Sequence, residues 1–366
     1  MGLQELWFVL IAVLFLGYFL LEGFDFGVGI LMRVLGRGPE TPERDRRRRA
    51  VLNTIGPVWD GNEVWLLVAG GAMFAAFPEW FATLFSGVYL PLFLILLALI
   101  FRAVAIEFRG KVDDAAWRRR WDHAIFWGSV VPALLWGVAF ANIVRGVAID
   151  ADKQVTGTLF DLLNPYGLLG GLVTLGVFTL HGAVFLGLKT SGDLRAEAVR
   201  IARFLAPVVL VLGGIFAVWT QLAHGHAWTW AAVAVAAAAL VGVVAAVAAD
   251  REGWAFAGTS LAITAVVVLL FGSLFPDVMP TTLADGVSLT VENASSSHYT
   301  LVVMTWAAAF LTPVVLVYQG WTYWVFRARI SEDHIPPSIG LRPARAARAA
   351  RTAGSAGGGE ADVTED

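Results

Sequence analysis

Long apolar runs alternate with short polar segments along most of this chain. Each run is rich in Leu, Ile, Val, Phe, Ala and Gly, and about 20 such residues are enough to cross a hydrocarbon core about 30 Å thick. The pattern therefore predicts an all-α, multi-pass membrane protein. The expected membrane-spanning helices lie near residues 6–31, 51–77, 80–108, 123–145, 165–189, 200–222, 227–249, 254–275 and 300–327.

The composition supports a membrane protein. Hydrophobic residues make up 58% of the chain and charged residues 15%, whereas ordinary globular proteins are about 45 to 50% apolar. The first run is too long and too acidic for a signal peptide, so we expect it to be retained. The chain has no cysteine, which excludes disulfides, iron–sulfur ligation and thiol chemistry.

The distribution of lysine and arginine indicates the number of spans and their orientation. The apolar part of the second span, 64–77, is short, so hydropathy alone would also allow eight spans. With nine spans and an external N-terminus, the cytoplasmic segments hold nearly all positive residues, and only Arg145 and Lys153 lie outside. Removing the second span would place the six positive residues of 102–120 outside, against the positive-inside rule. We therefore expect nine spans in a bacterial plasma membrane, with a cytoplasmic C-terminus.

The chain shows one expected domain boundary. Residues 1–334 are expected to form a single transmembrane domain. From about Ile335 the sequence becomes rich in Pro, Arg, Ala and Gly and ends in acidic residues, a composition that cannot bury a core. Residues 335–366 are therefore expected to be a disordered cytoplasmic tail.

Four carboxylates lie inside the first two predicted spans. Glu22 and Asp25 are three residues apart and share one helix face. On a continuous second helix, Asn53, Asp60 and Glu63 would fall within about 80° of one another and form a polar stripe. An acid at a helix centre costs about 2.5 to 3.5 kcal/mol, and such residues mark ion or proton pathways. The sequence therefore predicts proton-handling membrane machinery.

Two further charged residues end the third predicted span. Arg102 and Glu107 are five positions apart and point about 140° away from each other, so at most one of them faces the acids. A structural interpretation of the acids also stays open. They would then only stabilise helix packing, by pairing with Arg102 or by capping kinks at glycines and at Pro57.

The sequence gives little support for a metal or haem site within this chain. A carboxylate-bridged metal pair in a bundle needs a Glu-x-x-His motif, which the sequence lacks. Of the six histidines, only His181 lies well inside a predicted span. Haem iron needs an axial ligand such as histidine. A hydrogen-bonded packing histidine is the favoured interpretation. We therefore expect no metal site, no haem ligated by this chain alone and no nucleic-acid partner.

Three motifs stand out in the first spans: GFDFGVG at 23–29, NTIGPVWDGNEVW at 53–65 and AGGAMFAAFP at 69–78. They resemble subunit II of cytochrome bd-type quinol oxidases, and shorter similarities to that family continue to about residue 334. The motif around Asp60 is the most specific. Position 63 is Glu where some relatives have Gln, and position 22 is Glu where others have Asp.

The resemblance implies a respiratory complex that oxidises membrane quinol, reduces O₂ to water and takes protons from the cytoplasm. It implies a partner, subunit I, which ligates haem b and haem d, while this chain packs as two four-helix bundles with one peripheral helix. Asp60 matches the family aspartate associated with a proton path, Trp59 flanks it, and Asp25 matches a second acid. Small accessory subunits and a bound quinone are also compatible with the resemblance, although the sequence identifies no quinone pocket.

Two other functions stay open from the sequence. A proton-coupled secondary transporter would also be a helical bundle with buried acids, but transporters often repeat broken helices around a midplane site. Here the acids cluster in the first two spans and are missing from the sixth to ninth. A purely structural scaffold for a haem subunit is the second alternative.

Overall fold

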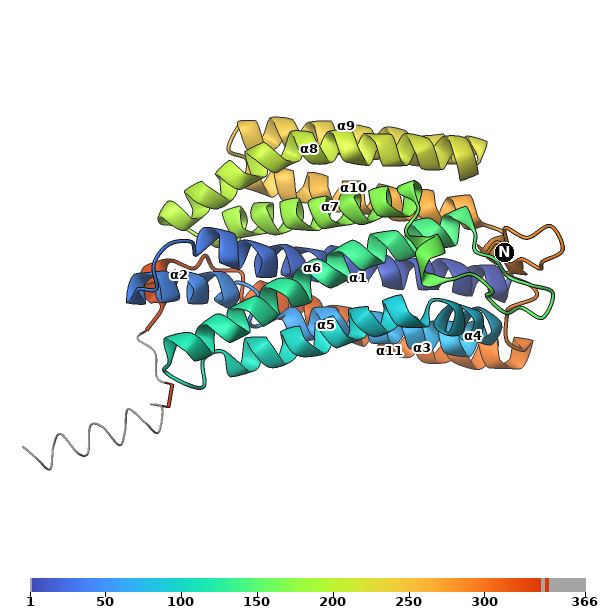
Figure 1. Ribbon diagram of the computed structural model, residues 1–366, viewed down its shortest axis with the longest axis horizontal. Coiled ribbons are helices and arrows are strands. Elements are labelled where there is room, and N and C mark those ends of the chain that lie inside the picture. The colour runs from blue at the N-terminus through green and yellow to red at the C-terminus, as the bar shows by residue number, and fades with distance from the viewer. Residues whose placement is uncertain (1, 337–339, 342–366) are drawn as a thin grey trace, which may run out of the picture.

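The computed structural model describes residues 2–336, 340 and 341, and helices dominate this part of the chain (Figure 1). Eight described helices are long and apolar enough to span a membrane, and α3 with α4, which meet at 120°, would make a ninth. The helices are α1 (Leu3–Leu35), α2 (Pro42–Asn53), α3 (Trp59–Ala76), α4 (Pro78–Gly87), α5 (Tyr89–Phe108), α6 (Ala115–Arg145), α7 (Pro165–Lys189), α8 (Gly192–His224), α9 (Trp230–Ala248), α10 (Glu252–Leu274) and α11 (His298–Val325).

Short elements complete the connections between the helices. Two strands, β1 (Asp277–Met279) and β2 (Leu289–Thr290), pair antiparallel in the loop that precedes α11. The 3₁₀ helices are η1 (Leu159–Leu162), η2 (Ala227–Thr229) and η3 (Glu332–His334). The expected all-α architecture with about nine spans is confirmed.

The second predicted span differs from the structure. A continuous helix over 51–77 is wrong, because α2 ends at Asn53 and α3 begins at Trp59 after a turn over 54–58. Pro57 has no backbone N–H and disfavours the helical conformation of the residue before it. The polar stripe expected from Asn53 to Glu63 is consequently interrupted.

The third predicted span is also divided. Its N-terminal part is α4, which starts at Pro78, a residue well suited to the first position of a helix. Val88 separates α4 from α5, which begins at Tyr89. As a result α4 lies at the end of the molecule that carries the N-terminus, and α5 returns along the bundle (Figure 1).

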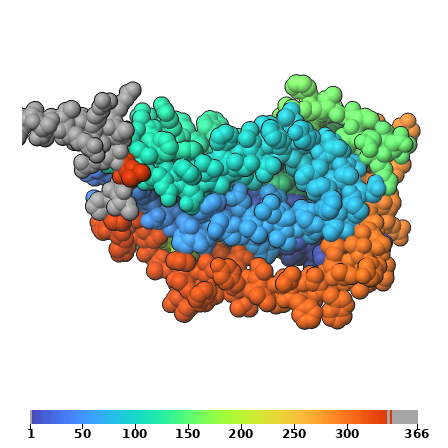
Figure 2. All heavy atoms as spheres, turned by 90° about the horizontal axis from the view of Figure 1, so that it is seen from below, coloured from blue at the N-terminus to red at the C-terminus, as the bar shows by residue number. Residues whose placement is uncertain are grey.

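The spans form two groups around α1. Helices α1, α3, α5 and α6 make one bundle and α7 to α10 the second, while α1 packs against α7 and α10 as well as against α3 and α6. The main contacts of α11 are with α1 and α3, and it forms one edge of the molecule beside α3 (Figure 2). This matches the expected two four-helix bundles with one peripheral helix.

Glycines bring α1 and α7 into backbone contact. A Cβ atom at Gly27 would lie 2.7 Å from the Cα of Gly182, well inside van der Waals contact. Small residues permit this approach in membrane proteins, where close packing replaces the hydrophobic driving force between helices. The junction of the two bundles therefore depends on this glycine pair.

Ion pairs join the elements at the end of the molecule that carries α2, called here the α2 end. Asp122 of α6 accepts hydrogen bonds from Arg48 (2.7 Å) and Arg109 (2.5 Å), and all three side chains are buried. Arg109 also donates to Asp45 of α2 (2.9 Å). Burial would lower the pKa of Arg109, but the adjacent Asp122 and Asp45 carboxylates outweigh it and raise that pKa. These pairs hold α2 against the turn between α5 and α6.

The C-terminal part of the described chain returns to the α2 end. Ile335 is buried among the residues of this end, and the backbone N–H of Leu341 donates to the carbonyl of Lys111 (2.9 Å). The remainder of the predicted tail, 337–339 and 342–366, lies outside the described residues.

We predict that Gly27→Ala lowers the free energy of unfolding by about 1 to 3 kcal/mol, because the added methyl group overpacks the contact with Gly182. Gly242→Ala is the matched control, since Gly242 lies within α9 with nothing inside 4 Å of its Cβ direction. Chemical denaturation in detergent measures both variants. Equal stability of the two would show that the α1–α7 approach is not tight.

Candidate functional site

A buried ion pair connects α1 to α5. Arg102 is 1% exposed and Glu22 is 0% exposed, and the guanidinium donates a hydrogen bond to the Glu22 carboxylate. The guanidinium carbon also lies 4.9 Å from the centre of the Phe26 ring. Glu107 is exposed, so the prediction that at most one of the two α5 residues faces the acids is confirmed.

Asp25 joins a second set of polar contacts that reaches the peripheral helix. The side-chain amide of Asn62 on α3 donates to Asp25 Oδ2 at 2.8 Å, and both residues are fully buried. The Asn62 carbonyl oxygen accepts the hydroxyl of Tyr323 at 2.7 Å and the amide of Gln319 at 3.4 Å. Trp65 Nε1 donates in turn to Gln319 Oε1 at 2.9 Å. A hydrogen-bonded chain thus runs from α1 through α3 to α11.

Several buried polar atoms around these residues keep unused hydrogen-bonding capacity. Glu22 Oε2 and Asp25 Oδ1 have no hydrogen-bond partner within the described protein, nor do Nε and Nη2 of Arg102. Buried polar groups in proteins are nearly always satisfied, by protein or by ordered water. Such a site can therefore hold water or a transferred proton, which a packed apolar core cannot.

Glu63 lies at the margin of this site. It is half-buried on α3 and interacts electrostatically with Arg102, Glu22 and Asp25. We call Glu22, Asp25, Glu63 and Arg102 the acid cluster. Its side chains come from α1, α3 and α5, three helices that are far apart in the sequence.

Asp60 occupies a different environment from the one expected. Its side chain is exposed at the start of α3, where Oδ1 accepts a hydrogen bond from the backbone N–H of Gly61 at 2.8 Å. The expectation that all four acids are buried together is therefore wrong for Asp60, because the turn over 54–58 starts a new helix there. Asn53 is also exposed, and Trp59 is half-buried.

His181 is a hydrogen-bonded packing residue. Nδ1 lies 2.7 Å from Thr259 Oγ1 and Nε2 lies 3.2 Å from the carbonyl oxygen of Leu20, so both ring nitrogens are engaged. The ring stacks on Phe256 with 4.6 Å between centroids. These contacts are the ones expected of a hydrogen-bonded packing histidine.

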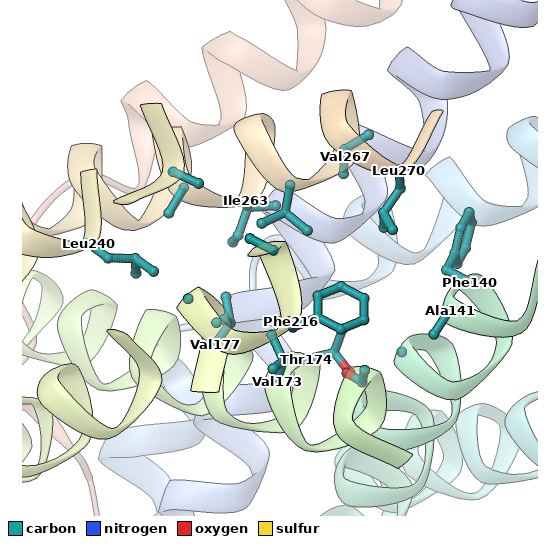
Figure 3. A pocket seen from close by; sticks show the side chains of 18 of the residues that line it. Phe140, Ala141, Val173, Thr174, Val177, Phe216, Leu240, Ile263, Val267 and Leu270 are labelled. Atoms are coloured by element: carbon teal, nitrogen blue, oxygen red, sulfur yellow. The ribbon is translucent and has the colours of Figure 1, made fainter. Parts of the chain in front are cut away.

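An apolar cavity of about 120 Å³ lies among α7 to α10 and is also lined by residues of α6 (Figure 3). Its one labelled hydroxyl belongs to Thr174, which donates to the carbonyl of Ala133 at 2.7 Å. Apolar cavities of this size stay dry and accept small nonpolar molecules. The remaining labelled lining residues are Phe140, Ala141, Val173, Val177, Phe216, Leu240, Ile263, Val267 and Leu270.

Sequence reasoning missed Asn62, Gln319 and Tyr323. Asn62 lies between Asp60 and Glu63, and this position in the motif was the available signal. Gln319 and Tyr323 are polar residues four positions apart in an apolar span, so they share one helix face. Nothing in the sequence indicates that this face meets α3.

Comparisons with known proteins agree with one another. A family model described as cytochrome bd terminal oxidase subunit II matches residues 3–326. A cytochrome bd ubiquinol oxidase subunit 2 of Bacillus subtilis (strain 168) is 43% identical over 335 residues, which cover 90% of this chain and 97% of the relative. The cytochrome bd-I ubiquinol oxidase subunit 2 of Escherichia coli (strain K12) is 36% identical over 371 residues, covering 91% and 96%.

The fold also resembles a solved structure. A chain in the structure of bd oxidase from Geobacillus thermodenitrificans superposes with a TM-score of 0.72 at 15% sequence identity. The match covers 89% of this chain and 99% of that one. The likeness supports the helical architecture described above.

We predict that Arg102→Leu destabilises the protein by about 3 to 5 kcal/mol, because it leaves the Glu22 carboxylate buried without its partner. Arg120→Leu is the control, since Arg120 is an exposed arginine on α6. Denaturant unfolding in detergent gives both values. The double variant Glu22→Gln/Arg102→Gln should recover part of the loss, and an Arg102→Leu variant as stable as the control would contradict the predicted cost.

Proposed function

The chain belongs to the cytochrome bd terminal oxidase subunit II family, and from this membership we propose that its acid cluster takes up protons for the reduction of O₂. The chain is a membrane-spanning subunit of a quinol:oxygen oxidoreductase complex, which carries haem and contains another subunit. The residues that move protons, the orientation in the membrane and the partner's share of the chemistry belong to the proposal.

The chemistry of the complex requires a route for protons. Reducing one O₂ to two waters consumes four electrons and four protons, and the oxidation of two quinols supplies the electrons and releases four protons. Protons for O₂ reduction that come from the side of the membrane opposite to the side where quinol releases its protons must cross part of the hydrocarbon layer. Ionisable side chains transfer protons through this layer. Buried acids with unused hydrogen-bonding capacity meet this requirement.

The order of the acids supports a path that starts at the α2 end. Asp60 is exposed at the beginning of α3, Glu63 follows one turn later, and the buried residues Glu22 and Asp25 come next. We assign Asp60 to proton capture and Asp25 to transfer, with Trp59 flanking the start of the path. The observation that carries this assignment is the fully buried Asp25 carboxylate, which has one oxygen bound to Asn62 and the other without a protein partner.

Charge supports the orientation of the chain. Arginines are concentrated at the α2 end, on α2 itself and around the turn between α5 and α6. Cytoplasmic loops carry an excess of Lys and Arg, so the α2 end would face the cytoplasm of a bacterial cell. The N-terminus would then lie outside, and the path would draw its protons from the cell interior.

The exposed face of α3 and α5 supports docking of the haem-bearing subunit I. Val64, Leu67 and Phe74 follow Asp60 on one side of α3, at the spacing of a single helix face, and all are exposed. Figure 2 shows this face, with α3 between α5 and α11. A partner on this face would cover Asp60 and connect the path to its own haem b and haem d, whose ligands it would supply. Further exposed apolar residues of α5 are Phe93, Leu97, Ile100 and Phe101.

The apolar cavity shown in Figure 3 gives little support to a bound quinone. The cavity of about 120 Å³ is well below the roughly 300 Å³ at which ordinary ligand pockets begin. A whole quinone head group therefore does not fit within it. Small accessory subunits stay an expectation of the family resemblance alone.

The other two functions differ in their support. The comparisons give none to a proton-coupled transporter, since the named relatives are oxidase subunits. The structural interpretation has support at one residue, because Glu22 pairs with Arg102. We therefore assign Glu22 and Arg102 to holding the electrostatic environment of Asp25, and Glu107, which is exposed, to no role in the path.

We predict that Asp60→Asn and Asp25→Asn each slow quinol-driven O₂ uptake of the assembled complex by about tenfold or more, because an amide cannot accept and release the transferred proton. Asp285→Asn, which removes a carboxylate exposed in the loop between β1 and β2, should keep the wild-type rate. An oxygen electrode measures the rate, and the haem spectrum of the same preparations reports assembly.

Two outcomes would count against this assignment. Wild-type uptake across the pH range in both variants would exclude a proton path through these acids. Loss of haem together with loss of uptake would instead support the structural interpretation of the cluster.

A further inference from the structure

We propose that Tyr323 on the peripheral helix α11 is a positioning residue for the proton path, acting on Asp25 through the side chain of Asn62. The inference rests on the proposed function of the acid cluster. It gives α11, whose residues are almost all exposed or half-buried in this chain, a direct part in the chemistry.

The first argument concerns the orientation of the Asn62 amide. An asparagine side chain has one donor end and one acceptor end. Its carbonyl oxygen faces two donors from α11, the Tyr323 hydroxyl at 2.7 Å and the Gln319 amide at 3.4 Å. Its NH₂ group faces two acceptors on α1, Asp25 Oδ2 at 2.8 Å and the Leu21 carbonyl at 3.5 Å. The donors from α11 therefore select the orientation that offers N–H to Asp25.

The second argument concerns the effect of that orientation on Asp25. A hydrogen bond donated to a carboxylate favours its charged form. The charged or titratable groups around Asp25 are Glu22 on its own helix, Arg102 on α5, Glu63 on α3 and Tyr323 on α11. The positive charge of Arg102 is shared with Glu22, to which it is bonded. The amide of Asn62 is a neutral donor that bonds directly to Asp25.

The third argument concerns what the loss of the Tyr323 hydroxyl would do. Without it, the amide keeps only the longer contact with Gln319 and is free to turn its oxygen toward Asp25. An oxygen in that place would repel the carboxylate and favour the protonated acid, so the proton would be released less readily. In a plot of turnover rate against pH, the acidic limb would then shift upward, so that half of the maximal rate is reached at a higher pH.

The chain offers a matched control on the same helix. Tyr318 is 64% exposed on α11, and Tyr318→Phe removes the same atom as Tyr323→Phe. Any general effect of losing a phenolic hydroxyl from α11 on insertion or expression is therefore common to the two variants. Only Tyr323→Phe removes the donor to Asn62.

The test measures O₂ uptake against pH for the assembled complex carrying Tyr323→Phe, Tyr318→Phe or Asp25→Asn. We expect Tyr323→Phe to retain its haem, to turn over about three to ten times more slowly near neutral pH, and to shift the acidic limb upward by about half a pH unit or more. Tyr318→Phe should follow the wild type. In the Asp25→Asn background, Tyr323→Phe should have no further effect, because the two residues act in series.

The outcomes separate this inference from the function on which it rests. If Asp25→Asn is impaired while the pH profile of Tyr323→Phe coincides with that of Tyr318→Phe, the positioning role is overturned and the proton path stands. If Asp25→Asn keeps full turnover, the assignment of Asp25 to proton transfer is overturned, and the positioning role of Tyr323 with it. A slowed Tyr323→Phe variant that loses haem, without a shifted profile, would make the contact structural and would also overturn the inference.

Discussion

The cost of placing charge in a hydrocarbon layer governs how this bundle is built. Glu22 is fully buried, so the helix that carries it needs a partner of opposite charge at a fixed distance, and Arg102 of α5 provides one. Asp25, one turn further along α1, is bound by an amide instead of a cation. The two acids therefore differ in their partners: Glu22 forms an ion pair with Arg102, whereas Asp25 accepts a hydrogen bond from the neutral amide of Asn62.

The same constraint explains the central position of α1. A helix with two buried acids cannot face lipid on that side, and α1 is surrounded by α3, α6, α7 and α10. On its other side, Gly27 meets Gly182 of α7 without intervening side chains. The contacts of Glu22 and Asp25 attach α1 to the first bundle. The Gly27–Gly182 approach and the contact between His181 and the Leu20 carbonyl attach it to the second, so both bundles hold the helix that carries the acids.

The sequence predicted the helical class, most spans and the two faces of α5, because these follow from hydropathy and from 100° per residue. It could not predict the break between Asn53 and Trp59, since a Gly-Pro pair within a membrane span is compatible with a kink as well as with a complete interruption. The exposure of Asp60 follows from that break. The partners of Asn62 could not be predicted from the sequence either, because Gln319 and Tyr323 lie more than 250 positions away and only the fold brings α11 beside α3.

The turn over 54–58 has a consequence for how the role of Asp60 can be studied. By starting a new helix, the turn supplies Asp60 with a donor from the main chain, the N–H of Gly61, in the first turn where such groups are otherwise unbonded. Scanning mutagenesis that exchanges one side chain at a time leaves this amide in place. Its contribution to capturing protons would be measured by removing the N–H itself, with an ester in place of the amide at position 61 or with proline at that position.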